Sequence, residues 1–254
     1  MSRELITSRA NPLVARMRRL RESRSERREA GLFLCEGPKL LREAAAWGAQ
    51  IDSVLCARGM ELPELPEGVR VAECPEELIA AAADTKTPQG VVFLCRIPRE
   101  APLTGRRFLV LDGLQDPGNV GTIWRTADAF GADGLILCGG CADPWGPKTV
   151  RATMGAAFRL PVWERPLDVL AGELAGMEVP LYATALREDT EDVRTAPLGE
   201  RSAVIIGSEG RGVSSLALSV CERTLKIPMR ARCESLNAAA AACVVLWEMA
   251  GKRL

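Results

Sequence analysis

The 254-residue sequence contains no histidine, no net charge and no long apolar run. Without histidine, Ser-His-Asp and Cys-His catalysis and the H-E-x-x-H zinc motif are impossible. No apolar run reaches the roughly 20 residues that span a bilayer, and the arginine-rich N-terminus lacks the apolar segment of a signal peptide. Nine cysteines without a secretion signal indicate the reducing cytoplasm. We therefore expect a cytoplasmic protein with no membrane partner.

The zero net charge conceals an asymmetry along the chain. Residues 1–30 hold nine arginines and four glutamates, a net charge of +5, so the remainder carries −5. A basic arm on a neutral protein suits phosphate contacts. The alternative is a solvated surface helix with Glu–Arg pairs, such as Arg18 with Glu22. Charge alone favours the two interpretations equally.

The first hundred residues predict a small α/β unit. Leu13, Met17 and Leu20 recur at helical spacing, and Pro38 is placed to open a second helix. The segment 97–107 combines Pro, Gly and charge, as linkers do. We divide the chain into a domain at 1–98, a linker at 99–107 and a second domain at 108–254. The expected elements of the first domain are helices at 13–28 and 38–47 and strands at 32–37, 51–57, 69–73 and 90–98.

The second domain alternates strands with helices. This alternation predicts a parallel sheet covered on both faces, with a ligand crevice beyond the C-terminal ends of its strands. There is no internal repeat. The expected strands are 108–114, 135–140, 180–186, 202–208 and 224–228, and the expected helices are 119–131, 148–158 and 236–252.

Two polar turns follow strands of this domain. In the turn 115–119, Asp116 or Asn119 is placed to cap the next helix, where Arg125 lies in an apolar neighbourhood. An arginine in a half-buried helix usually has an acidic or phosphate partner. The second turn, 207–212, is rich in glycine, and by itself it indicates an ordinary turn with a solvent-facing Glu209. The glycines at 118 and 121 do not make the GxGxxG fingerprint, so a nicotinamide-binding site is disfavoured.

The last motif is a polar loop that leads into a nearly all-apolar helix. Glu234, Ser235 and Asn237 stand at the helix start, where unpaired N–H groups attract a polar or anionic ligand. The ordinary explanation is that Ser235 is the N-cap. Because the helix is apolar on all sides, it should be buried from more than one direction, and a subunit partner could supply the second cover. One apolar stripe on it contains Leu236, Ala240, Cys243, Trp247 and Ala250.

Cys138 and Cys141 have the CxxC spacing of a redox or zinc site. A zinc site needs two further ligands, and Cys221 and Cys233 are poorly spaced for that role. We therefore predict no metal site.

Taken together and in this order, three blocks resemble the SpoU/TrmH-type RNA 2′-O-ribose methyltransferases of the SPOUT superfamily. The blocks are DPGNVGTIWRTADAFG, IIGSEGRGVS and LKIPMRARCESLNAAAA, within residues 108–254. The N-terminal part looks like the RNA substrate-binding domain of many members. The resemblance implies an α/β fold with a deep trefoil knot in the C-terminal parallel-sheet domain, bound S-adenosylmethionine, and a homodimer whose active site both subunits complete.

The resemblance also implies roles for individual residues. Ribosomal RNA is the first choice of target and tRNA the second, with antibiotic-resistance methylation a special case of the first. The RNA phosphates would be contacted by the arginines of the basic arm, Arg16, Arg18, Arg19, Arg21, Arg24, Arg27 and Arg28. The polar catalytic set would be Asn119, Arg125, Glu209, Ser235 and Asn237, and the cofactor walls would be Thr184, Ala185, Gly207, Ile227 and Leu236.

Methyl transfer requires the reacting groups to be held in line and the 2′-hydroxyl to lose its proton. The resemblance implies Arg125 as the base, although a guanidinium is not normally one. Either burial lets Arg125 deprotonate with help from the substrate phosphate, or Arg125 stays cationic and stabilises the developing alkoxide. In both versions Glu209 would hold Asn119 or Arg125 in place. The competing functions are a nucleotide-binding oxidoreductase and a non-catalytic RNA-binding protein on the same scaffold.

Overall fold

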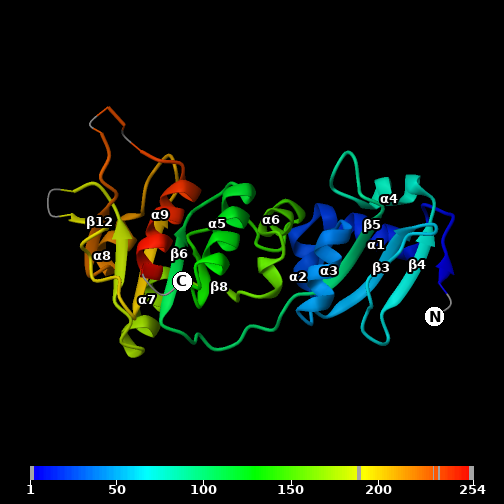
Figure 1. Cartoon of the computed structure of the whole chain (residues 1–254), viewed down its shortest axis with the longest axis horizontal. Helices are drawn as coiled ribbons and strands as arrows, with labels where there is room; N and C mark the ends of the chain where they lie inside the picture. Colours follow the sequence, from blue (N-terminus) through cyan, green and yellow to red (C-terminus); the bar gives the residue numbers. More distant parts are fainter. Residues whose placement is uncertain (1–2, 188–189, 231, 234, 252–254) are drawn as a thin grey trace. The chain divides into compact units, whose positions relative to one another are not determined.

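The computed structural model describes residues 3–187, 190–230, 232–233 and 235–251, and the chain forms two compact units (Figure 1). The first comprises Met1–Arg99 together with Asp143–Phe158, and the second comprises Glu100–Ala142 together with Arg159–Leu254. Asp143–Phe158 thus belongs with the first unit although it lies within the sequence of the expected second domain. No helix in the described ranges is long and apolar enough to cross a membrane.

The first unit is built on a five-stranded mixed sheet with strand order β1-β4-β3-β5-β2. Strand β5 pairs antiparallel with β2 and β3, and β4 pairs parallel with β3 and β1. The strands are β1 (Glu4–Leu5), β2 (Leu32–Glu36), β3 (Ile51–Ala57), β4 (Arg70–Cys74) and β5 (Val91–Arg96). The helices are α1 (Pro12–Glu22), α2 (Arg24–Ala30), α3 (Pro38–Ala46), α4 (Glu76–Ala82), α6 (Pro147–Thr153) and the 3-10 turn η1 (Ala156–Phe158).

The helix expected at 13–28 is divided in two at Ser23. Ser23 adopts extended backbone angles, and its side chain accepts a hydrogen bond from the N–H of Glu26, so it ends α1 and caps α2. The predicted apolar face is confirmed, because Leu13, Met17 and Leu20 are all buried in the core of this unit.

The segment Asp143–Phe158 is held in the first unit by a buried ion pair and an aromatic cluster. The Arg27 guanidinium donates to Asp143 from Nε at 2.9 Å and from Nη2 at 2.7 Å. The Phe33 ring lies 4.8 Å from the ring of Trp145 and 6.3 Å from that of Phe158. Both contacts join residues far apart in the sequence, so only the folded chain brings them together.

The prediction of a helix at 148–158 is wrong for its second half. Helix α6 ends at Thr153, because Met154 and Gly155 take positive φ angles of 51° and 102°. A side chain at position 155 would lie 2.9 Å from Glu43 Cγ, so glycine is required there for two reasons.

The second unit contains the predicted parallel sheet. Its seven strands run in the order β10-β12-β9-β11-β6-β7-β8, and every pair is parallel. The strands are β6 (Arg107–Asp112), β7 (Gly134–Cys138), β8 (Val162–Glu164), β9 (Leu181–Thr184), β10 (Glu191–Asp192), β11 (Ser202–Gly207) and β12 (Arg223–Lys226). The helices are α5 (Pro117–Ala129), α7 (Leu167–Gly176), α8 (Ser215–Val220) and α9 (Ala238–Ala250).

The helices cover both faces of this sheet, as expected. Helices α5 and α9 lie side by side (Figure 1), while α7 and α8 pack over the other face. The apolar stripe expected on α9 is mostly exposed: Ala240, Cys243 and Trp247 face solvent, and Ala250 alone of the stripe's helical members is buried. The buried face of α9 is instead made by Ala238, Ala242, Val245, Leu246 and Met249.

Candidate active site at the strand ends

The loops that follow β6, β9, β11 and β12 meet at the C-terminal edge of the parallel sheet, where a ligand crevice is expected. The loop after β6 ends in a capped helix start. Asp116 Oδ1 accepts a 2.8 Å hydrogen bond from the N–H of Asn119, which confirms the predicted capping and assigns it to Asp116. With its backbone N–H held in this way, the Asn119 side chain is left available for other contacts.

The loop after β11 is a tight turn. Ser208 and Gly212 exchange two backbone hydrogen bonds, of 3.0 and 2.9 Å. A Cβ atom on Gly207 would lie 2.1 Å from the backbone of Gly212, so the fold itself requires glycine at this position. The turn lifts Glu209 away from the strand end and toward α5.

Glu209, Asn119 and Asn237 form a chain of side-chain hydrogen bonds. Asn119 Nδ2 donates to Glu209 Oε1, and Asn237 Nδ2 donates to Asn119 Oδ1 at 3.3 Å. Three elements that are distant in sequence therefore meet in one polar group. The interpretation of the 207–212 segment as an ordinary turn with a solvent-facing Glu209 is incomplete, because this exposed carboxylate has a specific partner.

The N-cap of α9 is Asn237, so the prediction that Ser235 caps this helix is wrong. Asn237 Oδ1 accepts from the N–H groups of Ala239 and Ala240 at 2.9 and 3.3 Å. The helix begins at Ala238, which leaves Ser235 outside it and exposed. One asparagine thus caps α9 with its oxygen and reaches α5 with its nitrogen. Glu234 lies outside the described residues.

A pocket of about 300 Å³, called here the β9–β12 pocket, lies beside this polar chain. Its walls come from the loops after β9, β11 and β12 and from the start of α9. Glu209, which belongs to the polar chain, lines this pocket, and so does Ser235. All five predicted cofactor residues line it: Thr184, Ala185, Gly207, Ile227 and Leu236.

Arg125 stands apart from these groups. It is exposed on α5 and makes no hydrogen bond or ion pair to a described residue, although the sequence indicated a partner for it. It does not line the β9–β12 pocket. The structure therefore joins three of the five predicted catalytic residues by hydrogen bonds and places Ser235 at the pocket, while Arg125 is separate from both.

The predicted RNA-binding arginines divide into two groups. Arg27 is buried and paired with Asp143, so the prediction that it contacts RNA is wrong. Arg21 donates to the backbone oxygens of Ala81 and Ala83, and Arg16 lies 3.7 Å from Asp52. The arginines whose residues remain exposed on α1 and α2 are Arg18, Arg19, Arg24 and Arg28.

Cys138 and Cys141 are buried free thiols. Burial, with smaller contributions from Cys141 and Asp112, raises the pKa of Cys138 to about 12. The thiol of Cys141 donates to the carbonyl oxygen of Cys138 at 3.0 Å. Among the described residues no group of three or more Cys, Asp or Glu side chains could hold a metal ion.

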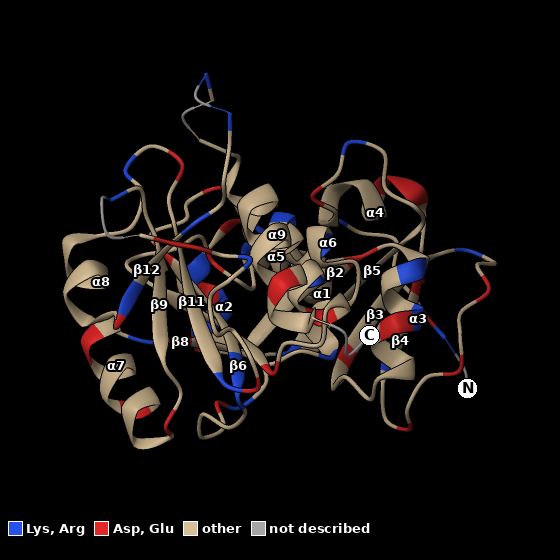
Figure 2. Cartoon of the chain, turned by 60° about the vertical axis from the view of Figure 1, so that its left-hand side comes forward, with Lys and Arg blue, Asp and Glu red and all other residues tan. Residues whose placement is uncertain are grey.

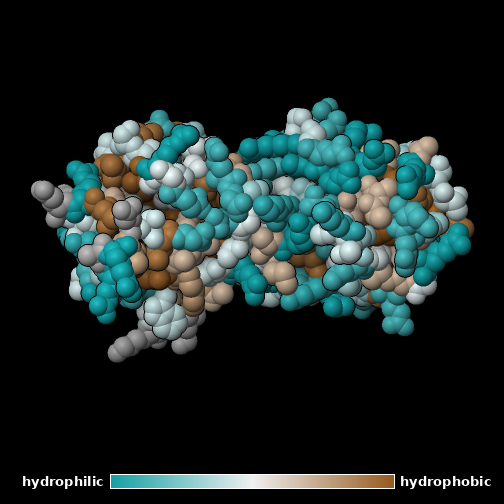
Figure 3. Space-filling view, turned by 90° about the horizontal axis from the view of Figure 1, so that it is seen from above, coloured by the Kyte–Doolittle hydropathy of each residue, from teal (hydrophilic) through white to brown (hydrophobic). Residues whose placement is uncertain are grey.

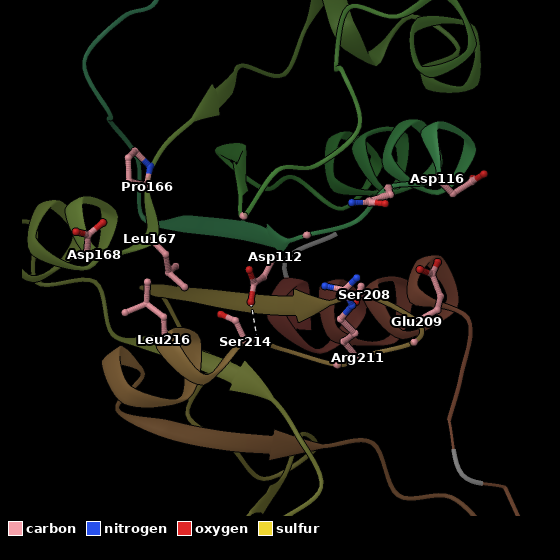
Figure 4. Close-up of a pocket in the computed structure, with 15 residues that line it drawn as sticks. Asp112, Asp116, Pro166, Leu167, Asp168, Ser208, Glu209, Arg211, Ser214 and Leu216 are labelled. Atoms are coloured by element: carbon pink, nitrogen blue, oxygen red, sulfur yellow. Dashed lines mark hydrogen bonds between the residues drawn. The ribbon is translucent and has the colours of Figure 1, made fainter.

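A larger hollow of about 660 Å³, called here the β6–β11 crevice, was not predicted from the sequence (Figure 4). It is lined by the loops after β6, β7 and β11 and by residues of α7 and α8, and it shares Ser208, Glu209 and Gly212 with the β9–β12 pocket. The only sequence signal for it was the general rule that parallel strands end at a ligand crevice.

Comparison with known proteins decides the family. The model of the SpoU rRNA methylase family matches residues 106–247, and an MRM3-like substrate binding domain matches residues 11–92. The chain belongs to the SpoU rRNA methylase family. The predicted RNA methyltransferase activity, with S-adenosylmethionine as methyl donor, is confirmed at the level of this family, as is its α/β SPOUT architecture.

Individual relatives match over almost their whole length. The chain is 35% identical to the 23S rRNA (guanosine(2553)-2′-O)-methyltransferase RlmP of Bacillus subtilis, over 90% of this chain and 92% of that protein. It is 34% identical to the 23S rRNA (uridine(2479)-2′-O)-methyltransferase of Streptomyces viridochromogenes, over 98% and 92%. A solved AdoMet-bound rRNA methyltransferase from Sinorhizobium meliloti aligns with a TM-score of 0.85 and 30% identity, covering 97% of each chain.

Proposed function

We propose that this SpoU-family protein transfers a methyl group from S-adenosylmethionine to a ribose 2′-hydroxyl of ribosomal RNA in the cytoplasm. The observation that carries the proposal is the contact between the Glu209–Asn119–Asn237 chain and the β9–β12 pocket. Relatives named as 23S rRNA 2′-O-methyltransferases support ribosomal RNA over tRNA as the target.

The β9–β12 pocket fits a cofactor of this kind. Gly207 and Ala185 line its wall, where Ile227 and Leu236 offer apolar surface and neighbouring loops offer backbone polar groups. We assign Thr184, Ala185, Gly207, Ile227 and Leu236 to this seat. When bound there, S-adenosylmethionine supplies an activated methyl group.

The polar chain positions the ribose. Glu209 fixes the amide of Asn119, and Asn119 in turn accepts from Asn237, so both amides have a defined orientation before RNA arrives. Pre-oriented groups lower the barrier because they need no reorganisation during transfer. Ser235, which borders the same pocket, is placed to contact the ribose hydroxyl. The oxidoreductase alternative is excluded by the family match.

Arg125 acts across a dimer in this proposal. It is exposed and does not line the pocket of its own subunit. In this proposal it reaches the active site of the partner subunit instead. An exposed guanidinium is cationic. We therefore assign it to the phosphate and to the developing alkoxide rather than to proton removal.

The exposed side of α9 supplies a surface for that partner. Trp247 is 57% exposed and Leu236 39%, and the Phe130 ring packs edge-on against Trp247 at 5.7 Å. Figure 3 shows that apolar surface of the seven-stranded unit reaches solvent. An exposed apolar stripe on a helix is typical of an oligomer contact. Family membership also supports the deep trefoil knot, which we propose for the chain around the β9–β12 pocket.

RNA contacts come from two basic regions. Figure 2 shows basic residues on the loop that follows β12, where Arg230 and Arg232 are exposed on the segment that precedes Ser235. In the first unit, whose sequence matches a substrate-binding domain, exposed arginines lie on α1 and α2. Such contacts recognise RNA by its shape and backbone.

The test is methyl transfer to unmodified 23S rRNA by wild-type protein and Arg125→Ala. The variant should lose at least about a hundredfold in rate while it keeps its affinity for S-adenosylmethionine. Mixing Arg125→Ala with Asn119→Ala subunits should restore activity, because one site of the mixed dimer contains both residues. Near wild-type transfer by Arg125→Ala would refute the assignment, and absence of S-adenosylmethionine binding by wild type would favour a non-catalytic RNA-binding protein.

The dimer has its own test. Trp247→Glu places a charge within the apolar stripe of α9 and should convert the protein to monomers in sedimentation experiments. Val169→Glu, at an exposed apolar residue of α7, is the matched control and should leave the assembly unchanged. A Trp247→Glu protein that remains dimeric would remove this stripe from the proposed interface.

A further inference from the structure

The β6–β11 crevice is not needed to seat the cofactor, yet it is the larger hollow of the seven-stranded unit. It lies where the chain leaves two adjacent strands in opposite directions: α5 follows β6 on one face of the sheet, and α8 follows β11 on the other. Such a switch point is where open parallel sheets usually bind ligands. Because the Ser208–Gly212 turn borders both hollows, a molecule in the crevice lies one loop away from the cofactor seat.

The floor of the crevice holds a carboxylate with a free oxygen. Asp112 is only 7% exposed, and its Oδ2 accepts a 2.7 Å hydrogen bond from the N–H of Ser214. Its Oδ1 accepts no hydrogen bond from a described residue. Glycine at position 139 leaves space for that oxygen, because a Cβ there would come within 2.5 Å of it. This oxygen is reached by solvent in the crevice rather than sealed beneath it, so an N–H donor of a ligand can approach it.

The two ends of the crevice differ in character. Figure 4 shows Leu167 and Leu216 at one end, Asp112 and Ser214 in the middle, and Asp116 and Glu209 at the other end. The apolar end suits a flat ring, the middle suits an N–H donor, and the polar end adjoins the Glu209–Asn119 contact.

The charges of the crevice exclude a phosphate as its main occupant. Four carboxylates line it, from Asp112, Asp116, Asp168 and Glu209, against one cation, Arg211. A metal ion is disfavoured too, since no described group of acidic residues has the arrangement to hold one. A neutral ring that carries N–H donors fits both the carboxylate in the middle of the crevice and its apolar end.

We propose that this crevice receives the base of the nucleotide whose ribose is methylated, and that Asp112 reads it as guanine. The inference depends on the proposed function. An enzyme that acts on one nucleotide of a folded RNA reads the splayed-out base by hydrogen bonds to its Watson–Crick edge and by packing on its faces. Guanine presents two adjacent donors there, N1–H and N2–H. Uracil presents one N–H between two carbonyl oxygens, which a carboxylate repels.

The experiment first maps the ribose that wild-type protein methylates in unmodified 23S rRNA, and then compares short target RNAs that carry guanosine or inosine there. Inosine lacks only the N2 amino group. Wild type should lose about tenfold to a hundredfold in kcat/KM with inosine. Asp112→Asn, which places a donor amide where Oδ1 lies, should abolish this preference while S-adenosylmethionine affinity stays unchanged. Asp168→Asn removes a charge from the rim and should keep the preference.

Three outcomes would overturn the inference: a methylated uridine, adenosine or cytidine, equal rates on guanosine and inosine in wild type, or a preference that survives in Asp112→Asn. If Asp112→Asn does not fold, Leu216→Asp tests the same crevice from its exposed apolar wall. It should raise the KM for RNA about tenfold, and an unchanged KM would count against the inference. Absence of methylation at every nucleotide would refute the proposed function itself, which keeps the two failures distinct.

Discussion

The five-stranded unit uses ion pairs to hold distant segments of its chain together, whereas the seven-stranded unit leaves polar side chains open at its strand ends. In the first unit, Arg27 is bound to Asp143, and Arg151 contacts both Glu36 and Asp84 at about 3 Å. In the second, Arg125 and Ser235 are exposed. The first arrangement fixes a segment of chain in place, and the second prepares a surface for a ligand.

This difference shows that the number of charges in a segment says little about their use. The basic arm is the most strongly charged part of the sequence, yet part of its arginine set stabilises the fold. The candidate residues of the seven-stranded unit, apart from Arg125 within α5, stand where parallel strands end, and there geometry favours a ligand. Breaking the first arrangement should therefore affect folding, and breaking the second should affect chemistry.

The largest effect is expected at Arg27. Arg27→Ala leaves Asp143 buried without its cation and should lower the free energy of unfolding by about 3–5 kcal/mol. Denaturant unfolding measures this free energy. Arg18→Ala, which replaces an exposed arginine of the same arm, is the control and should change stability by less than about 0.5 kcal/mol. Equal stabilities for the two variants would remove the structural role assigned to the buried pair.

The next effect is expected at Asn119, at the centre of the polar chain. Asn119→Ala should reduce methyl transfer about 10²- to 10³-fold, because Glu209 and Asn237 both lose their partner and the ribose loses its orientation. Unfolding and S-adenosylmethionine binding should change little. Ser219→Ala, an exposed hydroxyl of α8, is the control. Loss of folding rather than rate would mean that this chain of hydrogen bonds is structural.

A smaller effect is expected from the exposed arginines of the basic arm. Replacing Arg18, Arg19 and Arg28 with Glu should weaken RNA binding at least tenfold and lower the slope of log affinity against log salt by about 2. The stability of the protein should not change. Charge reversal at Arg42 and Arg99, exposed elsewhere in the first unit, is the control. An unchanged salt slope in the first variant would exclude α1 and α2 from the RNA surface.

The smallest effect concerns the buried thiols. The pKa of Cys138 is raised to about 12 by burial, so the folded state keeps its proton where an unfolded thiol, with a pKa near 9, loses it. Stability should therefore fall as the pH rises from 9 toward 12, by up to about 1.4 kcal/mol per pH unit for this group. The melting temperature of Cys138→Ala should fall less steeply with rising pH than that of wild type. The melting temperature of Cys233→Ala, which replaces an exposed thiol, should follow wild type. Parallel slopes for all three proteins would contradict the prediction.

Most secondary structure was predictable because it depends on local pattern. Five of the seven strands of the parallel sheet, the helix start at Asp116 and the apolar face of α1 follow from spacing and capping. The short strands β8 and β10 were not predicted. The errors have local causes as well. Ser23 interrupts a helical pattern, positive φ angles end α6, and Asn237 competes successfully with Ser235 for the N-cap.

The residues of the site were predictable from the sequence, but the hydrogen bonds that join them were not. Motif resemblance selected Asn119, Glu209 and Asn237, but no periodicity states that they touch one another, since 90 residues separate the first two. The sequence pattern also could not predict that Arg27 is buried and Arg125 exposed, because a sequence does not show which arginine pairs with a carboxylate in the fold.

Local pattern establishes the class of protein: alternating strands and helices, no histidine chemistry, and three motifs at strand ends that match the SpoU rRNA methylase family. The tertiary structure alone decided that Asp143–Phe158 joins the first unit, that Asn237 links two helices, and that Asp112 keeps one oxygen free in a crevice. The physical reason is the sequence distance over which each interaction acts. Propensity and capping act over a few residues, whereas ion pairs, crevices and shared hydrogen bonds depend on contacts between distant segments that only packing brings together.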